Sequence, residues 1–155
     1  MKKLFALLLA LTMVVTLTAC GGDSGKNASG SNKSGKAWPA ADYMPDGVAY
    51  TGGGEIVVVV PDMGGKPGAD FVYVNGATKK DFDAYVDQLT SGGITGSVTE
   101  LGEGVYLYGG EKDSFYINLS YYGDTPQTTM DKVDGEIVDV EYNLHISLGI
   151  NEMKQ

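Results

Sequence analysis

Few residues of this 155-residue chain are of the types that usually carry out catalysis. The single histidine, His145, has Asn143 and Ser147 as neighbours on the polar side of an alternating segment, where they could orient an imidazole as a base. The spacing sets no nucleophile beside it, and the sequence contains neither a Gly-x-Ser-x-Gly elbow nor a His-Glu-x-x-His motif. We therefore interpret His145 as a solvent-exposed histidine of a strand.

Carboxylates are the other candidates for acid–base chemistry. Asp131 with Asp134, and Asp139 with Glu141, form pairs that a glycosidase could use. Nothing in their spacing separates them from a solvated acidic surface. A small hydrolase that combines these pairs with His145 is one of three functions that the sequence leaves open.

The segment 130–141 is partly similar to a calcium-binding loop, with Glu141 at its twelfth position. Its first and third positions are Met130 and Lys132, which cannot supply carboxylates. We interpret the segment as an acidic hairpin turn before the last strand, and we expect no metal and no cofactor.

The chain contains ten tyrosines, two of which are candidate binding residues. Tyr116 and Tyr122 fall on the opposite face of their strand from Phe115, Ile117 and Leu119. Exposed tyrosines suit recognition, because the flat ring offers contact area and the hydroxyl forms hydrogen bonds. Strands also favour tyrosine for packing alone. Wall glycan and a protein partner would both use such side chains.

The charge balance limits the partners. All 11 basic residues are lysines against 20 acidic residues, and residues 37–155 carry six lysines and 19 carboxylates, a net charge of −13. An acidic unit repels the phosphate backbone, so we exclude nucleic acid as a partner.

The first 20 residues have the layout of an export signal. Lys2 and Lys3 precede an apolar run over 4–15, and the uncharged stretch 4–19 has 16 residues, fewer than the roughly 20 that a membrane-spanning helix needs. We predict a signal peptide over residues 1–19 rather than a permanent membrane span.

The end of this segment, Leu17-Thr18-Ala19-Cys20, resembles the lipobox of bacterial lipoproteins. The resemblance implies that Cys20 becomes the mature N-terminus and carries a diacylglyceryl thioether, with acyl chains such as palmitate. Two acyl chains hold a protein stably on a membrane where one does not. The resemblance also implies a location on the extracytoplasmic face of a bacterial cell membrane. Lipidation of Cys20 leaves no thiol for a disulfide or a metal site.

Residues 20–36 join this anchor to a folded unit. After Cys20 they are rich in Gly, Ser and Lys, and their one apolar side chain, Ala28, cannot bury enough surface to drive folding. We predict a flexible linker with a root-mean-square span of roughly 20–24 Å. Residues 37–155 are of a length typical of a single domain.

One helix is predicted within the domain. Thr78 is a good N-cap with Asp81 three residues on, and Gly92-Gly93 marks the end of the helix. The apolar residues between them fall on one helical stripe, namely Phe82, Tyr85, Val86 and Leu89. We assign Tyr85 to packing.

The other segments predict strands. The β-branched run 55–60 favours a strand buried on both faces or in the centre of a sheet, and 71–74 predicts the next strand. Segments 105–108 and 115–122 are joined through Gly109-Gly110, a two-glycine turn signal, into a hairpin.

The C-terminal segment completes the predicted fold. Every even residue from 138 to 150 is apolar, which predicts one long strand with one face inward. We therefore expect an α+β fold, a mainly antiparallel β-sheet with one amphipathic helix packed on one face.

Several structural motifs follow one another along the domain. They are the pairs Trp38-Pro39 and Met44-Pro45, a glycine before Glu55-Ile56, the pattern Asp81-Phe82-x-x-Tyr85-x-x-x-Leu89, and Gly92-Gly93. Together they resemble the domain of small Gram-positive bacterial lipoproteins of unknown function, in which a lipobox and a polar linker precede a compact α+β unit. The resemblance implies no catalytic residue, ligand or substrate.

We thus expect a membrane-anchored extracytoplasmic lipoprotein. Its favoured function is a non-enzymatic interaction module, which binds an envelope protein or peptide through the acidic, tyrosine-bearing exposed face of the sheet. The alternatives are a cell-wall glycan-binding module that uses Tyr116 and Tyr122, and the small hydrolase that uses His145.

Overall fold

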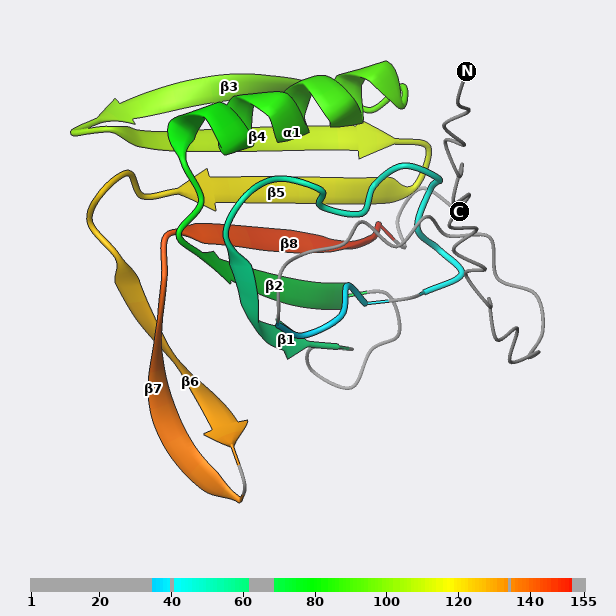
Figure 1. Cartoon of the computed structure of the whole chain (residues 1–155). Coiled ribbons are helices and arrows are strands. Elements are labelled where there is room, and N and C mark those ends of the chain that lie inside the picture. The colour runs from blue at the N-terminus through cyan, green and yellow to red at the C-terminus, as the bar shows by residue number, and fades with distance from the viewer. Residues whose placement is uncertain (1–34, 40, 62–68, 134, 152–155) are drawn as a thin grey trace, which may run out of the picture.

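The computed structural model describes residues 35–39, 41–61, 69–133 and 135–151 (Figure 1). The predicted signal peptide, Cys20 and most of the linker lie outside these residues. The described residues form one helix and eight strands: β1 Glu55–Val60, β2 Ala69–Asn75, α1 Lys79–Ser91, β3 Thr95–Gly102, β4 Val105–Lys112, β5 Phe115–Tyr121, β6 Gln127–Val133, β7 Glu136–Tyr142 and β8 Leu144–Ile150.

Six of the strands form one antiparallel sheet in the order β1-β2-β8-β5-β4-β3. Strands β6 and β7 pair only with each other among the described strands, as an antiparallel hairpin that extends away from the large sheet (Figure 1). The α+β class and the mainly antiparallel sheet are therefore confirmed.

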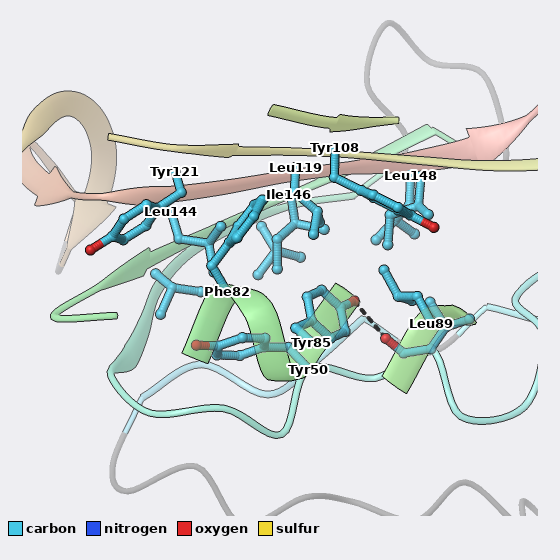
Figure 2. Close-up of a cluster of buried hydrophobic side chains, with 14 of the residues drawn as sticks. Tyr50, Phe82, Tyr85, Leu89, Tyr108, Leu119, Tyr121, Leu144, Ile146 and Leu148 are labelled. Carbon is cyan, nitrogen blue, oxygen red and sulfur yellow. Dashed lines mark hydrogen bonds between the residues drawn. The ribbon is translucent and has the colours of Figure 1, made fainter. Parts of the chain in front are cut away.

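The core lies against one face of the six-stranded sheet, which we call the inner face. Alternation along β5 and β8 places every second side chain there, as expected for strands with one buried face. The buried side chains of these two strands are Phe115, Ile117, Leu119, Tyr121, Leu144, Ile146 and Leu148. Three side chains of α1 lie in the same cluster, namely Phe82, Tyr85 and Leu89 (Figure 2).

Helix α1 begins as the sequence predicts. The backbone N–H of Asp81 donates to Thr78 Oγ1 at 3.2 Å, and Asp81 Oδ2 accepts from the backbone N–H of Thr78 at 2.8 Å, which completes a capping box. Asp81 Oδ1 also accepts from the backbone N–H of Gly53 at 2.8 Å, so the cap ties the turn before β1 to the helix. Tyr85 is buried, and its hydroxyl donates to the carbonyl of Val48 at 2.6 Å, which confirms its packing role.

Gly109-Gly110 is not a turn, contrary to the prediction. Both glycines lie inside β4, opposite β5, and the chain reverses at Asp113, which has a positive φ of 55°. The buried ring of Tyr108 explains the second glycine, because a Cβ at Gly110 would lie 2.5 Å from its hydroxyl. Gly96 on β3 is opposite Gly110 and lies as close to the same ring. Glycine inside a strand here marks a close approach.

The run 55–60 is an edge strand and not a central one. In the six-stranded sheet β1 pairs with β2 alone, and its register shifts between Ile56 and Val58. The outer side of β1 is met by Lys36, whose backbone N–H donates to the carbonyl of Ile56 at 3.0 Å. Lys36 Nζ also pairs with the carboxylate of Asp131 on β6. The apolar run thus reflects cover by neighbouring segments rather than a central place in the sheet.

The long strand predicted over 138–150 is broken at Asn143. Its first half is β7 of the hairpin and its second half is β8, in the middle of the six-stranded sheet. Asn143 is 8% exposed, and its side chain binds backbone groups of two other segments. Its Oδ1 accepts from the N–H of Ala77 at 3.0 Å, and its Nδ2 donates to the carbonyls of Ala77 at 2.7 Å and Gly123 at 3.2 Å. Because of these bonds, Asn143 belongs to neither β7 nor β8.

Replacement of Asn143 by alanine should destabilise the fold. The variant would leave the buried backbone groups of Ala77 without partners, and each unsatisfied group costs about 1–3 kcal/mol. We expect Asn143→Ala to lower the free energy of unfolding in urea by about 2 kcal/mol or more. Asn118→Ala removes the same amide from an exposed site of β5 and serves as the control. Equal stability of the two variants would contradict the role of Asn143.

Candidate binding surface

The side chains that alternate with the core form the second face of the six-stranded sheet, which we call the outer face. They come from β2, β5, the residue after β5, and β8. The members of the outer face that concern the sequence predictions are Phe71, Tyr73, Tyr116, Asn118, Ser120, Tyr122, His145 and Ser147. Most of them are half-buried, and Asn118 is exposed. The polar and aromatic character predicted for this face is therefore present.

Tyr116 lies near the start of β5, in the part of the outer face that is away from the hairpin β6–β7 and that we call the open part (Figure 1). Its cross-strand neighbours are Glu111 on β4 and Gly149 on β8, and it is half-buried. Asn118, two residues along the same face, lies between Gly109 and Ser147. On this surface the ring of Tyr116, the amide of Asn118 and the hydroxyl of Ser147 therefore lie beside two glycines, Gly109 and Gly149. Such a surface can stack against a flat group and form hydrogen bonds with it.

Tyr122 belongs to a different part of this face. It lies six residues from Tyr116 along an extended strand, a distance of about 20 Å. Its ring makes an edge-to-face contact with Tyr142 at 5.9 Å between ring centroids. The structure therefore does not bring the two predicted binding tyrosines together, and Tyr122 has a packing partner in the hairpin.

His145 lies in an aromatic cluster, not in solvent as the sequence suggested. Its ring stacks on Tyr73 with centroids 4.7 Å apart and an interplanar angle of 19°. Phe71 approaches edge-on at 5.2 Å, and Tyr142 of the hairpin contacts both Tyr73, at 4.8 Å, and His145, at 6.4 Å. The hairpin β6–β7 thus packs on the outer face through Tyr142, and His145 is one of the residues that Tyr142 contacts.

Burial lowers the pKa of His145 below its usual value of 6.5. In the part of the chain that the structure describes, its Nε2 atom is buried and has no hydrogen-bond partner. An imidazolium at this position would lose hydration without gaining an acceptor, so the neutral ring is favoured. The environment therefore suits packing, and His145 has no described carboxylate beside it to orient it as a base.

The acidic pairs are not assembled around His145. Asp139 and Glu141 are exposed on β7, on the opposite face of that strand from Tyr142, which contacts His145. Asp131 pairs with Lys36, and Asp134 lies outside the described residues. Segment 130–141 consists of the end of β6 and most of β7, which pair as an antiparallel hairpin.

A pocket of about 420 Å³ lies at the start of α1, where no site was predicted from the sequence. It brings together Lys79, Tyr106, Glu103 and Asp124 from separate parts of the chain. The Lys79 ammonium lies 4.2 Å from the centroid of the Tyr106 ring and 2.6 Å from the carboxylate of Asp83. Because the lysine already has these partners and the pocket carries charges of both signs, we assign no ligand to it.

Comparisons with known proteins give no further guide to the site. No family model, no curated protein and no solved structure matches this chain. Within residues 35–39, 41–61, 69–133 and 135–151, no three His, Cys, Asp or Glu side chains are placed to hold a metal ion. The helix of this same part of the chain is too short and too polar to cross a membrane.

The lowered pKa of His145 predicts a pH dependence of stability. The unfolded chain binds a proton at about pH 6.5 and the folded chain only at lower pH, so the stabilisation is complete above pH 6.5 and declines as the pH falls. The decline cannot exceed about 1.4 kcal/mol per pH unit, because a single imidazole takes up one proton.

The measurement compares the wild type with His145→Phe, which keeps a ring at this position but cannot titrate. Urea unfolding at a series of pH values should show that the stability difference between the two proteins shifts in favour of the variant below pH 6.5. A difference that does not change with pH would contradict the burial of His145 as a neutral ring.

Proposed function

We propose that this protein is a lipoprotein anchored through Cys20 to the extracytoplasmic face of a bacterial membrane, and that its domain is a non-enzymatic binding module. The single observation that carries the proposal is the division of the six-stranded sheet into a buried apolar face and an accessible polar face. Tyr116 and Asn118 lie on this polar face. If the face served only to keep the protein soluble, an aromatic ring at Tyr116 would contribute little to that role.

Helix α1 supports this division. We infer that it is amphipathic and packs on the inner face only, because its buried residues belong to the core and Asp83, Ala84 and Asp87 are exposed. The hairpin covers the part of the outer face around His145. The surface left for a partner is therefore the open part around Tyr116, Asn118 and Ser147.

The acidic charge of the domain indicates the kind of partner. With a net charge of −13 over residues 37–155, a partner with a basic surface associates faster than a neutral one. Glu111 lies directly opposite Tyr116 in the sheet and is exposed, so it adds negative charge to this part of the surface. We favour an envelope protein or peptide for this reason.

Site-specific photo-cross-linking in intact cells tests this proposal. A cross-linking residue at Asn118 should capture a discrete partner from the membrane fraction, because this position is in the centre of the open surface. The same residue at Ala84, an exposed position of α1, is the control and should capture nothing reproducible. Equal products at both positions, or recovery of the protein outside the membrane fraction, would contradict the proposal.

Wall glycan is the second candidate ligand, because Tyr116 has an amide and a hydroxyl close by on the same face. If glycan is bound by stacking, the domain should sediment with isolated peptidoglycan sacculi at both low and high salt. Tyr116→Ala should then reduce the bound fraction about tenfold, the loss expected when one stacked ring contributes about 1.4 kcal/mol. Thr128→Ala, on the exposed side of the hairpin, is the control. Retention that is unchanged in Tyr116→Ala would remove this candidate.

A further inference from the structure

The two edges of the six-stranded sheet differ in how far other described segments cover them. Along β1 the carbonyl of Ile56 is already bonded to the backbone of Lys36, and the register shift between Ile56 and Val58 bends the strand. An incoming strand therefore cannot pair along β1 without displacing the segment at Lys36. Bulges and covering segments of this kind protect sheet edges from unwanted pairing.

Strand β3 at the other edge also has a register shift, but it lies at the end of the strand, between Glu100 and Gly102, and no described segment other than β4 is bonded to its backbone. It pairs with β4 alone, and all eight of its residues are exposed. It contains no lysine or proline, and its one charged residue is Glu100. Val98 and Leu101 are 46% and 63% exposed. A long, weakly charged edge strand with free backbone groups is a template for another strand.

We propose that β3 is the contact of a symmetric dimer, in which it pairs antiparallel with β3 of a second copy of this chain. Antiparallel pairing of a strand with itself is two-fold symmetric, so each copy uses the same surface. The blocked β1 edge matters here, because head-to-tail addition of β3 to β1 would create open filaments. With β1 covered, the association closes at two copies.

The sequence of β3 suits pairing with itself. In a register centred on Val98, the two valines face each other and Glu100 of each copy lies opposite Gly96 of the other. The two carboxylates are then four residues apart along the strands, about 13 Å, which is longer than the Debye length of about 8 Å at physiological salt. The net repulsion between two acidic domains is screened in the same way, so the dimer should strengthen as salt is added.

The described chain begins at the opposite edge of the sheet. The chain enters the described structure at residues 35 and 36, beside β1, and β3 lies five strand spacings away across the sheet, about 24 Å. Confinement of both copies to one membrane raises their effective concentration. Only this concentration argument rests on the proposed lipid anchor, because the pairing itself involves β3 alone.

Disulfide cross-linking of the full-length chain in its native membrane tests the dimer. Single-cysteine substitutions at Ser97, Val98 and Thr99 are compared with Ile137→Cys, which is 74% exposed on the hairpin. The only natural cysteine is Cys20, so the unmodified chain measures any linkage through it. We expect Val98→Cys to form several-fold more dimer than Ile137→Cys. A maximum at Ser97 or Thr99 would support the same dimer with its centre moved by one residue.

A charge placed on the edge provides the second test. Val98→Lys puts two ammonium groups opposite each other and should abolish the dimer formed through Thr99→Cys, whereas Val98→Thr should retain it. Circular dichroism checks that both variants are folded. The proposal is wrong if no β3 position exceeds the Ile137 control, or if β3 cysteines link to a different protein. Labelling with radioactive palmitate tests the lipid anchor separately from the dimer. A dimer that carries no label would contradict the proposed anchor but would leave the proposed pairing of β3 intact.

Discussion

The hydrogen bonds of one buried amide hold the architecture together. Asn143 joins the loop before α1 to the segment after β5 through Ala77 and Gly123, and its backbone N–H donates to the carbonyl of Val74 at the end of β2. Its carbonyl accepts from the backbone N–H of Tyr122. Residues 74–77 and 122–123, which are distant in the sequence, therefore meet at this one residue. Because an unpaired polar group inside a protein is costly, this arrangement permits few alternatives.

The change of direction at Asn143 decides how the outer face is divided. The chain leaves the hairpin at Tyr142 and enters the centre of the large sheet at Leu144. Tyr142 therefore contacts Tyr73 and His145, and these rings form the aromatic cluster under the hairpin. The remainder of the outer face, around Tyr116, lies away from the hairpin (Figure 1). A single structural break thus separates a covered aromatic region from a half-buried polar surface.

The described chain begins beside one of the two edges of the six-stranded sheet. Lys36 binds β1 through its backbone and β6 through its ammonium group, so the chain enters the domain where the hairpin meets the sheet. The open edge β3 lies at the far side of the sheet. In the anchored protein that we propose, attachment through residue 36 would leave β3 at the edge opposite the point of attachment. In the binding module that we propose, the covered surfaces decide where a partner can bind.

The sequence by itself determined what depends on near neighbours in the chain. The cap of α1 at Thr78, the helical stripe and the alternation of β5 were predictable, because residues within a few positions set them. The place of β1 at an edge, the break at Asn143, the strand conformation of Gly110 and the burial of His145 were not. Each follows from a contact with a distant segment: Lys36 beside β1, Ala77 at Asn143, Gly96 and Ile117 paired with Gly110, and Tyr73 against His145. Only the tertiary structure decides such contacts, since periodicity fixes which way a side chain points and not what it meets.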